Sequence, residues 1–97
     1  MPVYMVERNF AEQIEENRQA ADEINLINAD AGVKWLISFL SVDKKKTFCL
    51  YEAPNAEAIR EAARRAGLPA DVIVEVGEEI IPSGAISALR ADRYVLA

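Results

Sequence analysis

The fold is decided by the stretch VKWLISFLSVDKKKTFCLYEAPNAEAIREAARRAG, residues 33–67. Its first half predicts two β-strands, residues 33–42 and 46–53, because β-branched and aromatic side chains are enriched there and charges are few. The connection between them is a short turn, so we expect the two strands to be antiparallel neighbours. Its second half predicts a helix that is capped by Asn55 and ends at Gly67.

The residues on either side of this stretch add a similar set of elements. Residues 2–8 predict a strand, and a helix is expected to start near Phe10, behind a capping Asn9, and to end at Gly32. Residues 71–81 predict a last strand. With right-handed crossovers, this order predicts an α+β chain of ferredoxin-like βαββαβ type, with a four-stranded antiparallel sheet and two helices on one face.

Two finer expectations accompany this fold. We expect the first and third strands to be central, adjacent and parallel. We also expect a ferredoxin-like domain over residues 1–82 and a C-terminal tail over residues 83–97, which the sequence leaves open as a short helix or an arm.

Composition limits the classes of function. A chain of 97 residues forms one domain, and its net charge of -5 argues against a nucleic-acid partner. There is no histidine, which removes the commonest transition-metal ligand and the usual general base. A single cysteine predicts a reducing, cytoplasmic location. No apolar run reaches ~18 residues, so we expect neither a membrane span nor a membrane partner, and no signal peptide.

The strand predicted over residues 33–42 is apolar on both faces. One face carries Val33, Trp35, Ile37 and Phe39, and the other carries Leu36, Leu40 and Val42. Since one layer of helices covers only one face of a sheet, something else must cover the other. We therefore expect a homodimer formed through the helix-free sheet face.

Two carboxylates form the first candidate site. If the first and third strands run parallel, Glu7 and Glu52 reach the same edge of the sheet, with Arg8 close enough to neutralise either acid. This arrangement would make a polar or cation site. The alternative is that both are solvated strand-end charges, with a weak ion pair between Arg8 and Glu52.

Two amides form the second candidate site. On a helix from Phe10, Gln13 and Asn17 fall within the apolar stripe that faces the sheet. Buried amides need hydrogen-bond partners, so these residues indicate a polar-lined ligand cleft between helix and sheet. The alternative is a helix start that overhangs the sheet and leaves both amides in water.

The third strand contributes Cys49 and Tyr51 to one face, because side chains alternate. Cys49 is a candidate soft metal ligand or redox thiol, or else a small apolar filler of the core. Tyr51 and Trp35 are candidates to line a ligand pocket, or else core or dimer residues.

Three segments resemble a bacterial family of unknown function that includes a small nickel-responsive, nickel-binding protein with a ferredoxin-like fold. They are MPVYMVER (1–8), the stretch AGVKWLISFLSVDKKKTFCLYEAPNAEAIREAARRAGLP (31–69), in which residues 46–69 are the most specific part, and the last strand. The resemblance implies a protein of the dimeric α+β barrel type, usually without an assigned reaction. It also raises nickel binding, although a histidine-based site is excluded here.

Two main functions follow, with a plain structural or interaction module as a third. The first is a non-catalytic homodimer that binds a small ligand or a metal ion. The second is an enzyme resembling the cofactor-free monooxygenases and isomerases that hold substrate between helices and sheet. We expect no cofactor and no bound transition metal, because Glu7 and Glu52 are hard donors and Cys49 is the chain's one thiol. Nickel binding is expected to be weak at best.

Overall fold

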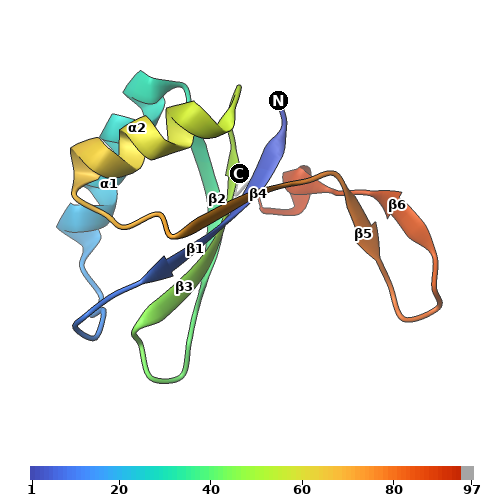
Figure 1. Ribbon diagram of the computed structural model, residues 1–97, viewed down its shortest axis with the longest axis horizontal. Helices are drawn as coiled ribbons and strands as arrows, with labels where there is room; N and C mark the ends of the chain where they lie inside the picture. The colour runs from blue at the N-terminus through green and yellow to red at the C-terminus, as the bar shows by residue number, and fades with distance from the viewer. Residues whose placement is uncertain (95–97) are drawn as a thin grey trace.

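A computed structural model describes residues 1–94 of the chain (Figure 1). The elements follow in the order β1 (Val3–Asn9), α1 (Arg18–Ala31), β2 (Lys34–Leu40), β3 (Lys46–Glu52), α2 (Ala56–Ala66), β4 (Val72–Val76), β5 (Glu78–Ile80), β6 (Ile86–Ala88) and the 3₁₀-helix η1 (Ala91–Tyr94). Within residues 1–94, no helix combines the length and apolar character needed to cross a membrane.

The main sheet has the strand order β2-β3-β1-β4, and its neighbouring strands are all antiparallel. This confirms the expected α+β, ferredoxin-like βαββαβ fold. The two central strands are β1 and β3, as predicted, but the expectation that they run parallel is wrong. The crossover through α1 makes β2 parallel to β1, and the hairpin then reverses the direction of β3.

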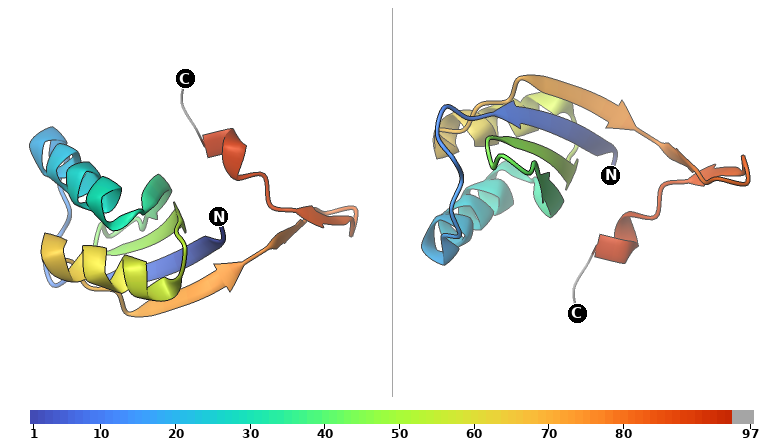
Figure 2. Two further views of the ribbon diagram at one scale, coloured as in Figure 1. Left: turned by 90° about the horizontal axis from the view of Figure 1, so that it is seen from above. Right: turned by 90° about the horizontal axis from the view of Figure 1, so that it is seen from below.

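Both helices cover the same face of the sheet, as Figure 2 shows from above and below. The core lies in this layer, where Ile59 and Ala62 of α2 contact Val6 of β1 and Cys49 of β3. Ile59 and Val6 are the largest side chains that are fully buried. The small side chains of Ala62 and Ala63 allow α2 to lie close to the sheet, and both are buried together with Ile59.

The second helix has the predicted ends, since Asn55 accepts a hydrogen bond from the Ala58 amide and Gly67 adopts a left-handed conformation. The first helix starts eight residues later than expected, at Arg18 instead of Phe10. Its cap is Asn17, whose side chain accepts a hydrogen bond from the amide of Ala20.

Residues 10–17 form an irregular segment that is bound to the β2–β3 turn. The amide of Phe10 donates to the Lys45 carbonyl, and the amide of Ile14 donates to the Lys44 carbonyl, both at 2.8 Å. In a helix that started at Phe10, the Ile14 amide would instead donate to the Phe10 carbonyl, so its bond to the turn accompanies the absence of a helix after Asn9. Asn9 is instead the last residue of β1, and its amide donates to Asp71 Oδ2 at 2.7 Å.

The last predicted strand is split at Gly77. Residues 72–76 pair with β1, whereas β5 leaves the sheet and pairs with β6 through a turn that includes Gly84, at φ 88°. Residue 82, the expected end of the domain, lies in this turn. We call residues 77–94 the C-terminal arm. It extends away from the sheet in Figure 1, and η1 returns to contact β2.

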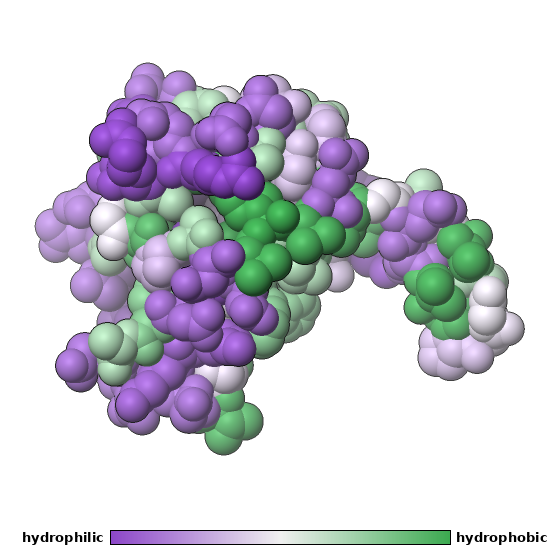
Figure 3. Space-filling model, viewed as in Figure 1, coloured by the Kyte–Doolittle hydropathy of each residue, from purple (hydrophilic) through white to green (hydrophobic). Residues whose placement is uncertain are grey.

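The other face of the sheet is not covered by α1 or α2. One row across it consists of Phe39, Phe48, Glu7 and Val72, and the next row consists of Ile37, Leu50, Met5 and Val74. Phe39, Val72 and Val74 are each close to half exposed. We call this surface the open face. Figure 3 shows apolar side chains gathered between the helix layer and the arm, and again near the tip of the arm.

Candidate functional site

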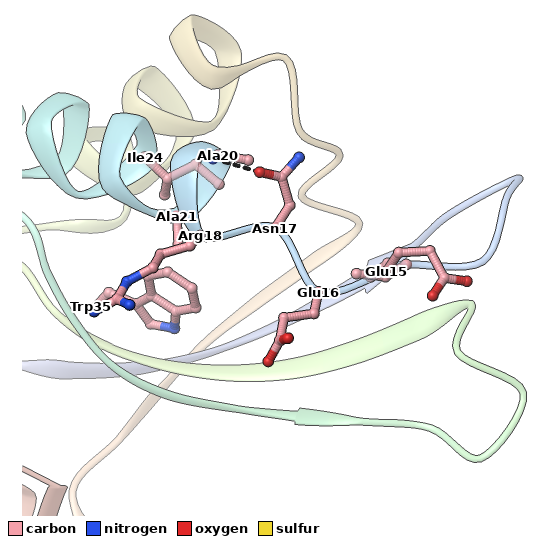
Figure 4. A pocket seen from close by; sticks show the side chains of 9 residues that line it. Glu15, Glu16, Asn17, Arg18, Ala20, Ala21, Ile24 and Trp35 are labelled. Carbon is pink, nitrogen blue, oxygen red and sulfur yellow. Dashed lines mark hydrogen bonds between the residues drawn. The ribbon is translucent and has the colours of Figure 1, made fainter.

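A pocket of about 410 Å³ lies between the helix-side face of the sheet and the segment formed by residues 10–17 and α1. It opens into a shallower outer hollow of about 660 Å³ along the start of α1. The two share lining residues, including Trp35, Ile24 and Asn17. Figure 4 shows the outer hollow, with Trp35 on the sheet side and Ile24 and Ala21 on the helix side. We refer to the inner volume as the inner pocket.

Strands β1, β2 and β3 provide the floor of the inner pocket. Alternation of side chains places Arg8, Thr47, Cys49 and Tyr51 on the helix-side face, and each of them is at least nine-tenths buried. The walls are mainly apolar and consist of Phe10, Ile14, Ala20, Ile24, Leu40 and Leu68. The arrangement is an apolar pocket with a small group of polar side chains at its base.

Arg8 is the charged group of this floor, and it is only 4% exposed. Its guanidinium donates one hydrogen bond to the Pro69 carbonyl and another to Tyr51 Oη, at 3.2 Å. The guanidinium carbon also lies 5.6 Å from the centroid of the Tyr51 ring. Both hydrogen-bond partners are neutral. Among residues 1–94, none of the ion pairs within 4.0 Å includes Arg8.

Tyr51 does not supply a negative charge to Arg8. Burial raises the pKa of the Tyr51 phenol above its ordinary value, and the nearby positive charge of Arg8 only partly opposes this effect. The phenol is therefore protonated at neutral pH. Since its oxygen accepts from Arg8, its proton is not used in that hydrogen bond, and Cys49 lies beside it.

A chain of hydrogen bonds runs along the β2 and β3 side of the floor. Trp35 Nε1 donates to Ser38 Oγ at 2.9 Å, and Ser38 Oγ donates to Cys49 Sγ at 2.9 Å. The Cys49 thiol in turn donates to Thr47 Oγ1 at 3.4 Å. Cys49 is thus a buried, hydrogen-bonded free thiol, and Trp35 is held in place at the boundary between the inner pocket and the outer hollow.

Glu7 and Glu52 are not brought together, so the expectation of a shared sheet edge is wrong. Glu7 pairs with Phe48 and Glu52 pairs with Val3, which places the two carboxylates about 13 Å apart along the ladder. The reason is the antiparallel pairing of β1 and β3. Arg8 lies on the opposite face from Glu7, and the charge closest to Glu7 is Lys46, at 3.8 Å.

The two predicted amides have different roles from those expected. Gln13 is exposed and donates to the Asp43 carbonyl at 3.2 Å, so it helps to bind residues 10–17 to the hairpin. Asn17 does line the pocket, but at its rim, as the cap of α1 (Figure 4). The helix–sheet cleft is present, although its polar groups come from the strands.

Sequence reasoning missed Ser38 and Thr47. Thr47 was detectable, because it alternates with Cys49 and Tyr51 in the same strand. Ser38 was not, because a bulge between Trp35 and Ile37 shifts the register of β2.

A family model described as "Nickel responsive protein SCO4226-like" matches residues 4–76. The chain is also similar to the crystal structure of SCO4226 from Streptomyces coelicolor A3(2), with a TM-score of 0.67 and 28% sequence identity. This similarity covers 76% of this chain and 94% of that one. No curated protein matches the sequence. The resemblance noted in the sequence is confirmed, and the family match ends where the C-terminal arm begins.

Proposed function

The chain belongs to the SCO4226-like family of nickel-responsive proteins, and we propose that it is a small homodimeric binding protein that holds a small molecule in the inner pocket without transforming it. The observation that carries this proposal is the pocket itself. Its volume of about 410 Å³ lies within the range of ligand sites, ~300–1,000 Å³, and its apolar walls converge on buried polar groups.

The open face supports the homodimer. Phe39, Phe48, Val72 and Val74 are apolar and partly exposed on the sheet face opposite α1 and α2. Glu7 lies between Phe48 and Val72 in this surface, and Leu50 beside it is already buried within one copy. A monomer would leave this surface in water, whereas two copies stacked face to face would bury it. Cys49 lies on the helix side, so two copies of this residue would not meet across such an interface.

Binding is favoured over catalysis by the titratable groups of the pocket. Among the described residues that line the pocket, one has a carboxylate side chain. This residue is Glu15, which is exposed on the segment before α1. An acid–base catalyst has to lie within hydrogen-bond reach of the reacting atom. The floor instead offers a guanidinium, a phenol, a thiol and two hydroxyls, which suit recognition.

The name of the family suggests nickel as a ligand. The side chains of one protomer do not provide the ligands that nickel prefers. Nickel favours imidazole and thiolate ligands. The chain has no histidine, and within residues 1–94 no three His, Cys, Asp or Glu side chains come close enough to hold a metal ion. Glu7 and Glu52 are hard donors on opposite parts of the open face. We propose weak nickel binding at best, and a cytoplasmic location consistent with the single reduced cysteine.

Native mass spectrometry of the protein purified from its own host tests the binding function. We expect a dimer that retains a small molecule, and we expect Ala20→Phe to remove that molecule, because Ala20 lines both the inner pocket and the outer hollow. The matched control is Ala29→Phe, on an exposed position of the same helix. Retention of the molecule by Ala20→Phe would place it elsewhere and contradict the proposal.

A further inference from the structure

We infer that the inner pocket takes a small apolar monoanion of the carboxylate class, whose charged head binds Arg8 and Tyr51 and whose apolar body lies against the walls. This inference rests on the binding function proposed above and goes beyond it by naming the chemical class of the ligand. It follows from the contacts of Arg8, from the state of Tyr51 and from the composition of the walls.

Within residues 1–94, Arg8 is a buried charge with no ion pair. A buried charge is costly unless it is paired, and buried arginines are ordinarily found beside carboxylates. Here the guanidinium is 4% exposed, and its hydrogen-bond partners are a carbonyl and a phenol. A guanidinium has more N–H donors than these two contacts use. An anion in the pocket would supply the missing charge and accept from the remaining donors.

Tyr51, the neighbour of Arg8, stays protonated and neutral. Because burial raises the pKa of Tyr51, the phenol does not neutralise the guanidinium. Its hydroxyl is instead a second donor beside the first. A planar carboxylate accepts both kinds of hydrogen bond, and charge-assisted bonds of this type are about twice as strong as neutral ones.

The residues that line the pocket limit the shape and charge of its ligand. Phe10, Ile14 and Ile24 line the inner pocket around the polar floor and match an aliphatic or aromatic body. The floor carries one cationic side chain, Arg8, and the rim carries the exposed carboxylate of Glu15. One negative charge is therefore favoured over two. The protein as a whole has a net charge of -5, so any preference for anions must come from the pocket itself.

Trp35 provides the readout, because it is the single tryptophan of the chain and lines the pocket. We would titrate the full-length protein with octanoate, octanamide and octylammonium, and follow the emission of Trp35. The three probes share one chain and differ in the charge of the head. We expect octanoate to bind about tenfold or more tightly than octanamide, because its head makes charge-assisted hydrogen bonds, and octylammonium to bind most weakly.

Variants then assign the preference to the pocket. In Arg8→Gln, octanoate should fall to the affinity of octanamide, while octanamide should change little. The matched control is Arg60→Gln, on an exposed arginine of α2, which should keep the preference. Because Arg8→Gln alters a buried position, Tyr51→Phe is the second variant, and it should weaken octanoate more than octanamide. Circular dichroism confirms that each variant is folded.

The outcomes separate the two proposals. Equal binding of octanoate and octanamide that Ala20→Phe abolishes would overturn the carboxylate assignment and leave the binding function in place. A preference for octanoate that persists in folded Arg8→Gln would also overturn it. Absence of binding by all three probes, together with a purified dimer that carries no small molecule, would reject both proposals.

Discussion

The ferredoxin-like domain and the C-terminal arm differ in what holds them in place. Within residues 1–94, all buried residues lie between Val3 and Ala63, and none lies in the described part of the arm. The arm is held by the pairing of β5 with β6 and by the contact of η1 with β2. Within the arm, the Glu79 carboxylate also accepts hydrogen bonds from the Arg90 amide at 3.0 Å and from Arg93 Nη1 at 2.9 Å. The domain is therefore stabilised by a buried core, whereas the arm is stabilised mainly by local hydrogen bonds. Changes in one region should therefore leave the other largely intact.

The largest effect should come from the core. Ile59→Ala should lower the free energy of unfolding by about 2–5 kcal/mol, because Ile59 is 1% exposed and packs between α2 and the sheet. The matched change in the arm, Ile80→Ala, should cost less than about 0.5 kcal/mol, since Ile80 is 70% exposed. Chemical denaturation of the two variants measures both values. A similar loss in each would mean that the arm shares the core of the domain.

The next effect should come from the open face of the domain. Phe48→Glu should weaken the proposed dimer by more than about 2 kcal/mol, because it places a charge in an apolar interface. Sedimentation should then show a particle near 10.7 kDa in place of one of twice that mass. Lys44→Glu, in the exposed β2–β3 turn, is the charge-changing control and should stay dimeric. A folded monomer for the unmodified chain would contradict the proposed interface.

A smaller effect should come from a helix cap. Asn55→Ala removes the hydrogen bond to the Ala58 amide and should cost about 1 kcal/mol of stability. In the arm, Ser83→Ala removes a longer contact to the Ala85 amide, 3.4 Å, and its effect on the unfolding of the domain should be undetectable. Thermal unfolding of the two variants compares them. An equal decrease would show that the turn of the arm and the domain unfold as one unit.

The smallest effect should be a pH dependence limited to the arm. The hydrogen bond from the Arg90 amide, assisted by Arg93, lowers the pKa of Glu79 below its ordinary value of 4.5. A group with a lowered pKa stabilises the folded form above its unfolded pKa, and this stabilisation is lost as the pH falls through the folded pKa. The chemical shift of the Arg90 amide should therefore change as the pH falls below 4.5, and Glu79→Gln should remove that change. The amide of Val6 in the core should be insensitive to the same transition.

The order of elements was predictable because its signals are local. Asn55 and Gly67 delimit α2 through their own backbone preferences, and the short connection between β2 and β3 requires a hairpin. The start of α1 was not predictable in this way. Asn9 and Asn17 both have the chemistry of a cap, and the choice between them depends on hydrogen bonds from residues 10–17 to the distant β2–β3 turn.

The candidate site was predictable in part. Trp35, Tyr51 and Arg8 were identified from their residue types, and alternation along β1 places Arg8 on the same face as Val6. The pairing of Glu7 with Glu52 failed for a reason that the order of elements already contains, because a crossover followed by a hairpin reverses β3. The contact between Arg8 and the Pro69 carbonyl joins residues far apart in the chain, so no local pattern indicates it.

Strand β3 has a consequence for how this sequence tolerates change. Its side chains alternate between the inner pocket, which receives Thr47, Cys49 and Tyr51, and the open face, which receives Phe48 and Leu50. Because the two sets point to opposite faces, a substitution in one set should leave the other face unchanged, so the proposed ligand specificity and the proposed dimer affinity should evolve separately. A change in the length of β3, in contrast, would affect both faces. Deletion of one residue would exchange the two sets and place phenylalanine beneath α1 and tyrosine on the open face, so both surfaces would be lost at once.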